Sequence, residues 1–211
     1  MAEVKRRYHS PVREEHARRT REAVLTAAAR LFEDRGYAAT SLADVAAVAG
    51  VARPTVTAAF GSKPALLKQV LDVALAGDDE PVPVAERPWF APVLQAPDAA
   101  AALSAYAHVC LVIGRRAARL FEAVRRAADD APETADLWRT LCANRRAGAT
   151  MVVRRLAELT TLPDERRAVD LVWLFNDPAH YAALVLDAGW PEDAYQGWLA
   201  HMLRAAVLPP R

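Results

Sequence analysis

The sequence predicts an all-α protein made of two structural units. Of its 211 residues, 53% are hydrophobic and only 8 are glycine. Alanine, the best intrinsic helix former, dominates the hydrophobic fraction. Apolar residues recur at helical spacing along most of the chain, and no segment shows the alternation typical of a strand. The length exceeds the usual domain size of about 100 to 150 residues, which favours two units.

Charge is distributed unevenly along the chain. Residues 1–63 carry 11 Lys and Arg against 7 Asp and Glu, a net charge of +4, while the remainder carries 16 against 19, a net charge of −3. A basic excess confined to one part is typical of nucleic-acid binding, although a solvated basic tail without a partner gives the same count.

The two cysteines, Cys110 and Cys142, lie far apart and have no histidines nearby, so the sequence predicts neither a disulfide framework nor a metal site. We expect both to be small core residues in a reducing cytoplasm. No signal peptide is recognisable, and no apolar run approaches the roughly 18 residues of a membrane helix. We therefore expect a soluble cytoplasmic protein without membrane contact.

Residues 1–19 are predicted to form a basic, flexible arm. They include Lys5, Arg6 and Arg7 but few large apolar side chains, so they cannot build a core of their own. Such arms lie along DNA phosphates or enter a minor groove. The alternative is an inert tail.

A first helix is predicted from Thr20 to about Arg35, because apolar side chains recur on one face and Gly36 stands where a left-handed C-terminal cap is favoured. Thr40 or Ser41 is expected to cap the second helix by accepting from its free backbone N–H groups.

A tight turn at Gly50 separates the second helix from a third. Val56 and Phe60 stand four residues apart in this third helix and are expected to point inward. The proline in its first turn is tolerated because the missing N–H is not needed there. The residues expected to face outward or to lie at the mouth of this helix are Arg53, Pro54, Thr55, Thr57 and Ala58.

A fourth helix completes a domain that we place at residues 20–76. Prolines then forbid a continuous helix over residues 77–98, which are predicted to be a linker. Trp89 and Phe90 within it are expected to pack on the second domain, residues 99–211. Helices in that domain are predicted at about 99–131, with a break near Gly114, and at 133–159, 165–176, 178–187 and 192–206.

Anchor residues of several kinds recur at regular offsets over about residues 20–75. They are Leu31-Phe32, Gly36-Tyr37, Thr40-Ser41, Val45-Ala46, Ala49-Gly50-Val51, Phe60-Gly61-Ser62-Lys63 and Leu66-Leu67. This arrangement resembles the N-terminal domain of the tetracycline-repressor (TetR) family of transcription regulators. Residues 170–199 are similar to the C-terminal ending of many regulators of this type.

The resemblance implies a homodimeric repressor that binds a palindromic operator on double-stranded DNA through the third helix and is released by a small-molecule effector. An arginine at the mouth of that helix can donate two hydrogen bonds to guanine, and threonines can contact base edges or a thymine methyl group. The family places phosphate contacts at Thr40, Ser41 and Lys63. The predicted DNA-binding residues are Arg6, Arg7, Thr40, Ser41, Arg53, Pro54, Thr55, Thr57 and Lys63.

Three positions depart from the family pattern. The family usually carries Tyr where Thr57 stands, often His or Tyr where Ala59 stands, and commonly a Ser cap where Ala52 stands. Either the DNA affinity is lower than usual or the basic arm replaces the missing phosphate contacts, and we favour the second interpretation.

The resemblance also assigns dimerisation to about residues 165–206, because a monomer would expose a large apolar face there. The alternative is that these aromatic residues fill the core of their own protomer. We expect a hydrophobic effector among the helices of residues 99–160. Candidate wall residues, each also explained as plain core, are Tyr106, His108, Cys110, Phe121, Trp138, Cys142 and Trp173. Candidates to receive a carboxylate, or to form a solvated face, are Arg115, Arg116, Arg145 and Arg146.

The sequence contains no pattern typical of an enzyme. Its five histidines are scattered, and it lacks a HExxH motif, a phosphate-binding glycine loop and a nucleophile elbow. We therefore predict no catalytic residue, no metal and no cofactor. The alternative to a ligand-responsive regulator is a helical DNA-binding or interaction protein with no inducer response.

Deletion of residues 1–10 is expected to weaken operator binding and to flatten its salt dependence, because fewer phosphate contacts release fewer counterions. Binding titrations at several salt concentrations measure this slope. An unchanged slope would contradict a role for the arm.

Overall fold

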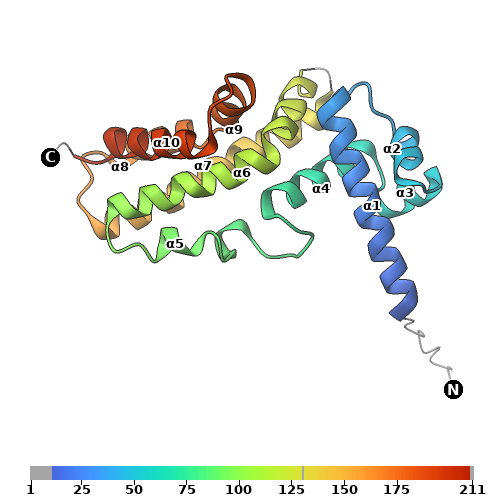
Figure 1. The fold of residues 1–211 in the computed structure, drawn as a ribbon, viewed down its shortest axis with the longest axis horizontal. Helices are drawn as coiled ribbons and strands as arrows, with labels where there is room; N and C mark the ends of the chain where they lie inside the picture. The colour runs from blue at the N-terminus through green and yellow to red at the C-terminus, as the bar shows by residue number, and fades with distance from the viewer. Residues whose placement is uncertain (1–10, 130, 210–211) are drawn as a thin grey trace. The chain divides into compact units, whose positions relative to one another are not determined.

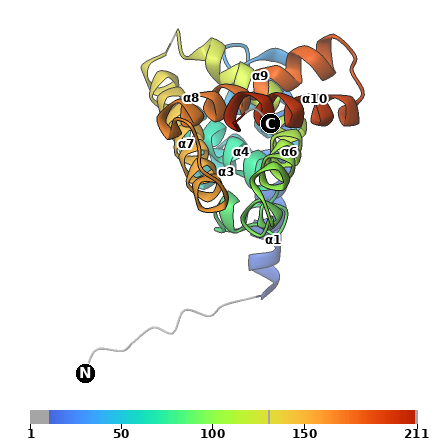
Figure 2. The ribbon, with the colours of Figure 1, turned by 90° about the vertical axis from the view of Figure 1, so that its left-hand side faces the viewer.

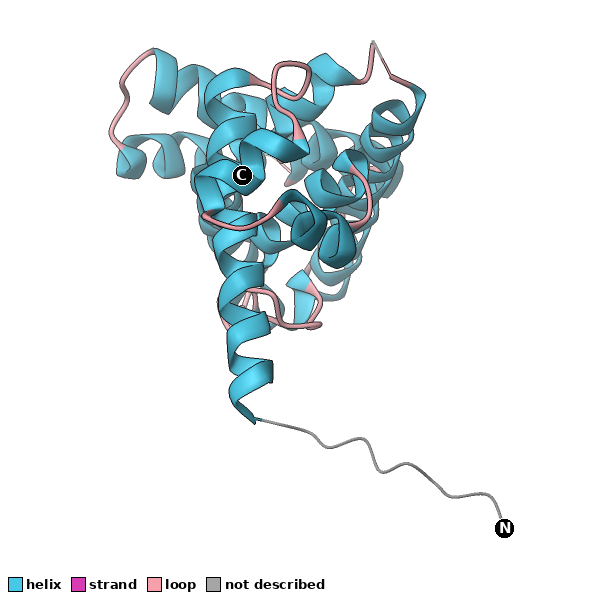
Figure 3. Ribbon diagram, turned by 90° about the vertical axis from the view of Figure 1, so that its right-hand side faces the viewer, coloured by secondary structure: helices cyan, strands magenta, loops and turns pink. Residues whose placement is uncertain are grey.

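The computed structural model describes residues 11–129 and 131–209, and every regular element in this part of the chain is a helix (Figure 3). The prediction of an all-α fold is thus confirmed. The chain divides into two compact units, Met1–Val70 and Leu71–Arg211. This division lies within helix α4 (Lys63–Ala76), and the four-part organisation inferred from the sequence stays a prediction.

The N-terminal unit contains three helices and the start of a fourth. Helix α1 packs against α2, and α2 packs against α3. Phe32, Val45 and Val56 from these three helices are completely buried, as are Leu66 and Leu67 of α4. The helices are α1 (Pro11–Arg35), α2 (Leu42–Ala49), α3 (Arg53–Phe60) and α4 (Figure 1).

Helix α1 begins at Pro11. The prediction of a flexible arm over residues 1–19 is therefore wrong from Pro11 onward. The charged side chains of this segment pair along the helix surface: Glu15 accepts hydrogen bonds from Arg18 at 2.9 Å and from Arg19 at 2.8 Å. Pairs three and four residues apart stabilise a helix. The basic residues therefore support helical structure that apolar periodicity alone did not predict.

A left-handed glycine connects α2 to α3. Gly50 has φ 66° and ψ 31°, and its N–H donates toward the carbonyls of Ala46 and Ala47. The two helix axes differ in direction by 110°, which lies in the range for a helix-turn-helix. In the described part of the chain no single helix is long and apolar enough to cross a membrane; only the bent pair of α2 and α3 meets that test, by length and composition alone.

The C-terminal unit is built around helix α6. This helix packs against α7, α9 and α10, while α8 packs against α7 and α10 (Figure 2). The elements are η1 (Val84–Glu86), α5 (Ala91–Leu94), α6 (Ala99–Ala127), α7 (Pro132–Leu159), α8 (Glu165–Phe175), α9 (Pro178–Tyr181), the π-helical η2 (Ala182–Asp187) and α10 (Glu192–Val207).

Helix α6 runs through Gly114 without interruption, so the predicted break there is wrong. A Cβ atom at Gly114 would lie only 2.7 Å from the Cβ atom of Tyr181. Glycine is therefore needed for the close approach of α9 rather than for a bend. Phe90 is buried in the core of this unit and Trp89 packs against it, as predicted.

Gly50→Ala is expected to destabilise the protein by about 1–2 kcal/mol, because a left-handed backbone costs that much for an L-residue with a Cβ atom. The matched control is Gly148→Ala in α7, where no atom crowds an added Cβ and φ is not positive. This control should be neutral or stabilising by up to about 1 kcal/mol. Urea denaturation followed by circular dichroism measures both, and equal effects of the two substitutions would contradict the backbone argument.

Candidate nucleic-acid interface and ligand cavity

Helix α3 has one buried face and one exposed face. Val56 and Phe60 are buried, which confirms their predicted inward orientation. The fixed inner face leaves the rest of the helix surface open to a partner. The exposed residues of α3 are Arg53, Pro54, Thr55, Thr57, Ala58 and Ala59.

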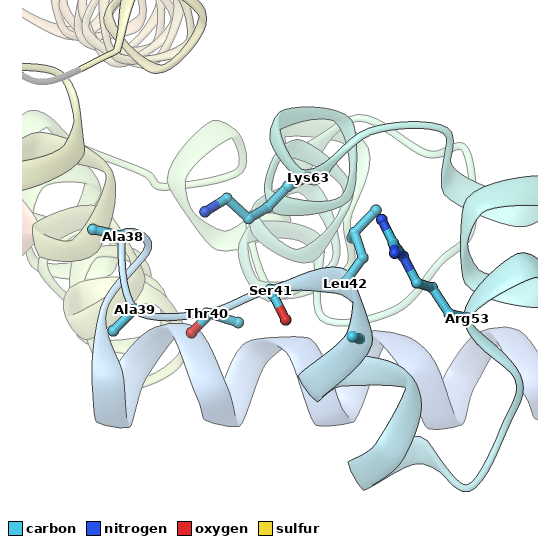
Figure 4. A pocket seen from close by; sticks show the side chains of 8 residues that line it. Ala38, Ala39, Thr40, Ser41, Leu42, Arg53 and Lys63 are labelled. Carbon is cyan, nitrogen blue, oxygen red and sulfur yellow. The ribbon is translucent and has the colours of Figure 1, made fainter.

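A hollow of about 430 Å³ lies beside the start of α2. Three of its lining residues, Ser41, Arg53 and Lys63, come from the N-cap of α2, the start of α3 and the start of α4 (Figure 4). Two cationic side chains and a hydroxyl therefore converge on one surface depression. Arginine, lysine and serine are the side chains that commonly contact DNA phosphates.

Ser41 forms a complete capping box with Asp44. The Asp44 backbone N–H donates to Ser41 Oγ at 3.1 Å, and the Ser41 backbone N–H donates to Asp44 Oδ2 at 2.8 Å. Hydrogen bonds from the Ser41 side chain and backbone lower the pKa of the Asp44 carboxyl. The capping box fixes the start of α2 at the edge of the hollow, where the partial positive charge of the helix N-terminus favours an anion.

The Thr40 side chain forms hydrogen bonds within the domain. It is only 2% exposed, and its hydroxyl lies 2.8 Å from the carbonyl oxygen of Gly36 and 3.2 Å from that of Leu31. Because the hydroxyl donates within the domain, Thr40 holds the turn between α1 and α2. Thr40 also lines the hollow, and its predicted phosphate contact stays a prediction.

The ammonium group of Lys63 is positioned by the turn that follows α1. Lys63 Nζ donates to the backbone carbonyl of Tyr37 at 3.0 Å and lies 4.0 Å from the centre of the Tyr37 ring. A cation over an aromatic face is favoured electrostatically. These contacts hold the positive charge at the wall of the hollow rather than leaving it on a freely moving side chain.

The start of α3 lacks a side-chain cap. Ala52 occupies the N-cap position with φ −73° and ψ 143°, and its side chain forms no capping hydrogen bond. The Thr57 hydroxyl donates weakly, at 3.3 Å, to the Arg53 carbonyl. Arg6 and Arg7, also predicted to contact DNA, lie outside the described residues.

The C-terminal unit contains a cavity of about 740 Å³, a size typical of ligand pockets. Its wall is formed by the last turns of α4, the loop over residues 78–85, and parts of α6 and α7. Tyr106, Cys110 and Phe121 lie on this wall, where the sequence analysis placed them. Burial raises the pKa of the Cys110 thiol to about 12.

Four predicted wall residues do not line the cavity. His108 is exposed, with Nδ1 3.2 Å from Oε1 of Gln196. Trp138 packs edge-on against Phe121, with 6.4 Å between ring centres. Cys142 is half-buried elsewhere on α7. Trp173 also lies off the cavity; its ring packs beneath two guanidinium groups. Helical periodicity indicates which residues face inward but not which ones border an unfilled space.

A polar network joins the cavity wall to the junction of α8 and α9. The Asn176 side-chain amide donates to the Tyr106 hydroxyl at 2.9 Å, and Arg145 Nε donates to Asn176 Oδ1 at 3.1 Å. Arg145 also pairs with Asp177 at 2.8 Å and donates to the Trp173 carbonyl at 2.9 Å. Sequence patterns did not identify Asn176 as a site residue, because its partners on α6 and α7 are distant in sequence.

The loop after α4 is ordered around a buried guanidinium. Arg87 is 7% exposed. It donates to Asp78 Oδ2 at 2.6 Å, to the Glu80 carbonyl at 2.9 Å and to the Val82 carbonyl at 3.1 Å. The Arg87 guanidinium holds the pKa of the Asp78 carboxyl below its usual value. The sequence predicted only a linker over residues 77–98, although the acidic residues 78–80 border the cavity.

Over residues 11–129 and 131–209, no three His, Cys, Asp or Glu side chains are grouped closely enough to hold a metal ion.

Residues 24–70 match the family model of bacterial regulatory proteins, tetR family. No curated protein matches the chain. The fold is similar to that of a transcriptional regulator from Rhodococcus sp. Rha1, with 18% identity, coverage of 90% of this chain and 99% of that chain, and a TM-score of 0.66. It is also similar to NalD, the secondary repressor of the MexAB-OprM multidrug efflux pump in Pseudomonas aeruginosa, with 18% identity, coverage of 91% and 97%, and a TM-score of 0.67. A third similar structure is a candidate transcriptional regulator from Saccharomonospora viridis in complex with choline, with 18% identity, coverage of 93% and 100%, and a TM-score of 0.63.

The capping analysis predicts opposite effects for two substitutions in the N-terminal unit. Ser41→Ala removes the cap of α2 and should destabilise the protein by about 1 kcal/mol, whereas Ala52→Ser supplies the missing cap of α3 and should stabilise it by up to about 1 kcal/mol. Urea denaturation measures both. A destabilising Ala52→Ser would show that the N-cap geometry at α3 does not accept a serine side chain.

Proposed function

Because this chain belongs to the tetR family of bacterial regulatory proteins through its N-terminal domain, we propose that it is a ligand-responsive repressor that binds a palindromic operator as a homodimer. The observation that carries this proposal is the exposed face of α3 beside the hollow formed with Ser41 and Lys63. A small helix with a fixed inner face and a cationic mouth fits the major groove of DNA.

In the proposed complex, α3 lies in the major groove and Arg53 donates to a guanine edge. Thr55 and Thr57 are exposed on the same helix and supply contacts to neighbouring bases, as does the apolar ring of Pro54. Ser41 and Lys63, at the helix starts beside the hollow, contact phosphates and set the register of the helix on the duplex.

We assign dimerisation to residues 165–206. Exposed apolar side chains in this segment support the assignment: Leu174 is 52%, Leu186 39% and Trp190 38% exposed. Solvent-exposed groups of large apolar residues mark interaction surfaces. Other aromatic residues here pack within the protomer, since Trp198 contacts Phe175 at 6.4 Å between ring centres. Two recognition helices in such a dimer would need a separation of one DNA turn, roughly 34 to 36 Å.

The cavity supports an effector-controlled equilibrium. Its wall includes Asp72 and Ala76, which belong to the helix that begins at Lys63. An effector that favours one position of α4 over another would shift the population between DNA-binding and released dimers. The choline complex of the structural relative from S. viridis supports a small-molecule effector, and the name of NalD supports repression.

Selection of bound sequences from a random DNA pool tests the operator proposal. We expect a palindromic consensus, a dimer in sedimentation analysis, and a loss of about 1–3 kcal/mol in specific binding for Arg53→Ala with relaxed preference at one position per half-site. Arg30→Ala, which removes an exposed arginine on α1 that pairs with Asp34, is the control and should leave the preference unchanged. A monomer without sequence preference would overturn the proposal.

A further inference from the structure

We infer that the cavity of the C-terminal unit binds a hydrophobic effector that bears a carbonyl group, whose oxygen accepts a hydrogen bond from the Tyr106 hydroxyl. This inference rests on the proposed effector function and specifies the chemistry of that same site. It depends on three features: an apolar cavity body, a buried hydroxyl on the cavity wall, and a hydrogen-bond network that fixes the direction in which this hydroxyl donates.

The body of the cavity is apolar. Phe90, Val109, Ile113, Phe121 and Met151 lie on its lining. Removal of hydrocarbon surface from water against such side chains is favourable. The lining therefore selects for a hydrophobic body, but it does not indicate which polar group the effector carries.

Tyr106 supplies a buried hydroxyl on this wall. It belongs to α6, is 5% exposed and lines the cavity. Burial raises the pKa of its phenol group, so the hydroxyl keeps its proton at neutral pH. A neutral phenol both donates and accepts hydrogen bonds. The chemistry of the effector depends on which of these two roles the protein itself occupies.

Asn176 occupies the acceptor role. Arg145 Nε, which can only donate, lies 3.1 Å from Asn176 Oδ1 and so identifies this atom as the amide oxygen. The amide nitrogen therefore faces Tyr106 and donates to its hydroxyl at 2.9 Å. The same nitrogen donates to the Arg145 backbone carbonyl at 3.2 Å, so both amide protons are used. The Tyr106 oxygen accepts, and its own proton must go to another group.

Arg145 holds the Asn176 amide in this orientation. Its guanidinium pairs with Asp177 at 2.8 Å and donates to the Trp173 carbonyl at 2.9 Å. A reversed amide would place its N–H groups against the Nε–H of this fixed guanidinium, so that two donors would face each other. The direction of the hydrogen bond to Tyr106 is therefore set by contacts that do not involve the cavity.

The Tyr106 proton has only a weak acceptor in the described part of the chain. Cys110, one helical turn further along α6, interacts with the hydroxyl, but a thiol sulfur accepts hydrogen bonds weakly. Asn176 and Cys110 both line the cavity, which places the hydroxyl between them at the cavity wall. Buried donors are nearly always paired with an acceptor. A carbonyl oxygen on the bound molecule would be the stronger acceptor for this proton.

Two probes of similar shape test the inference: 2-acetylnaphthalene, which carries a ketone, and 2-ethylnaphthalene, which carries no polar group. Their dissociation constants are measured by equilibrium dialysis on the full-length protein and on Tyr106→Phe. We expect the ketone to lose about tenfold in affinity in the variant, because its oxygen loses its donor, while the hydrocarbon keeps its affinity. Each probe is compared only with itself, so the different hydrophobicity of the two probes cancels.

Tyr195→Phe is the matched control. Tyr195 is 1% exposed on α10 and does not line the cavity. The substitution removes one buried hydroxyl from the same structural unit, as Tyr106→Phe does. Both probes should bind this variant as they bind the parent chain.

Infrared spectroscopy of the bound, isotope-labelled ketone gives a second measurement that does not depend on affinity. A carbonyl stretch moves to lower frequency when its oxygen accepts a hydrogen bond. We expect the ketone bound to the parent chain to absorb below its frequency in an alkane solvent and to return toward that frequency in Tyr106→Phe. If Tyr106→Phe does not fold, the spectrum of the parent complex decides: an alkane-like frequency would overturn the inference.

The remaining outcomes also overturn the inference. Equal losses of both probes in Tyr106→Phe would indicate a structural role for the hydroxyl, and no loss of the ketone would show that Tyr106 does not contact it. Failure of both probes to bind would exclude this class of effector. Sequence-specific DNA binding by the ligand-free protein is measured in parallel. Intact DNA binding with a failed ketone test would overturn this inference alone, whereas loss of sequence preference would overturn the proposed function.

Discussion

The proposed DNA-binding surface of this chain depends on the burial of two side chains on one short helix. Val56 and Phe60 are buried, and their four-residue separation defines the inner face of α3. A helix of eight residues is too short to be stable alone. Packing of this face therefore stabilises α3 and determines which of its side chains point outward. Only then does Arg53 stand on an exposed helix start beside Lys63 and Ser41.

A second constraint is that several polar side chains form hydrogen bonds or ion pairs within the protein and are not free to bind a partner. In the sequence, Thr40 and Arg145 are candidates to contact a partner. In the structure, the Thr40 hydroxyl donates to carbonyls of the α1–α2 turn, and Arg145 pairs with Asp177. Buried polar groups must be satisfied within the fold, because an unpaired one costs about 1–3 kcal/mol. Partner chemistry therefore falls to side chains that the fold leaves exposed, such as Arg53.

The sequence predicted those features that local rules determine. Helix periodicity, a cap at Thr40 or Ser41 and the turn at Gly50 depend on neighbours within a few residues, and each appears in the structure, with Ser41 as the cap. Features that depend on distant partners were not predictable in this way. Gly114 continues a helix because Tyr181 approaches it, and Arg87 orders a proline-rich loop through contacts that composition does not reveal. The cavity wall likewise joins residues from four separate segments.

The position of the cavity links effector binding to the proposed response. The cavity wall begins at Asp72 on α4 and continues through Glu80 on the following loop, with Gly77 between them in a left-handed conformation at φ 97°. An effector bound in this cavity would therefore interact with the last turns of α4 and with the loop together. Since an effector shifts an equilibrium only through differential affinity, contacts to α4 itself are the ones that can favour one position of this helix over another.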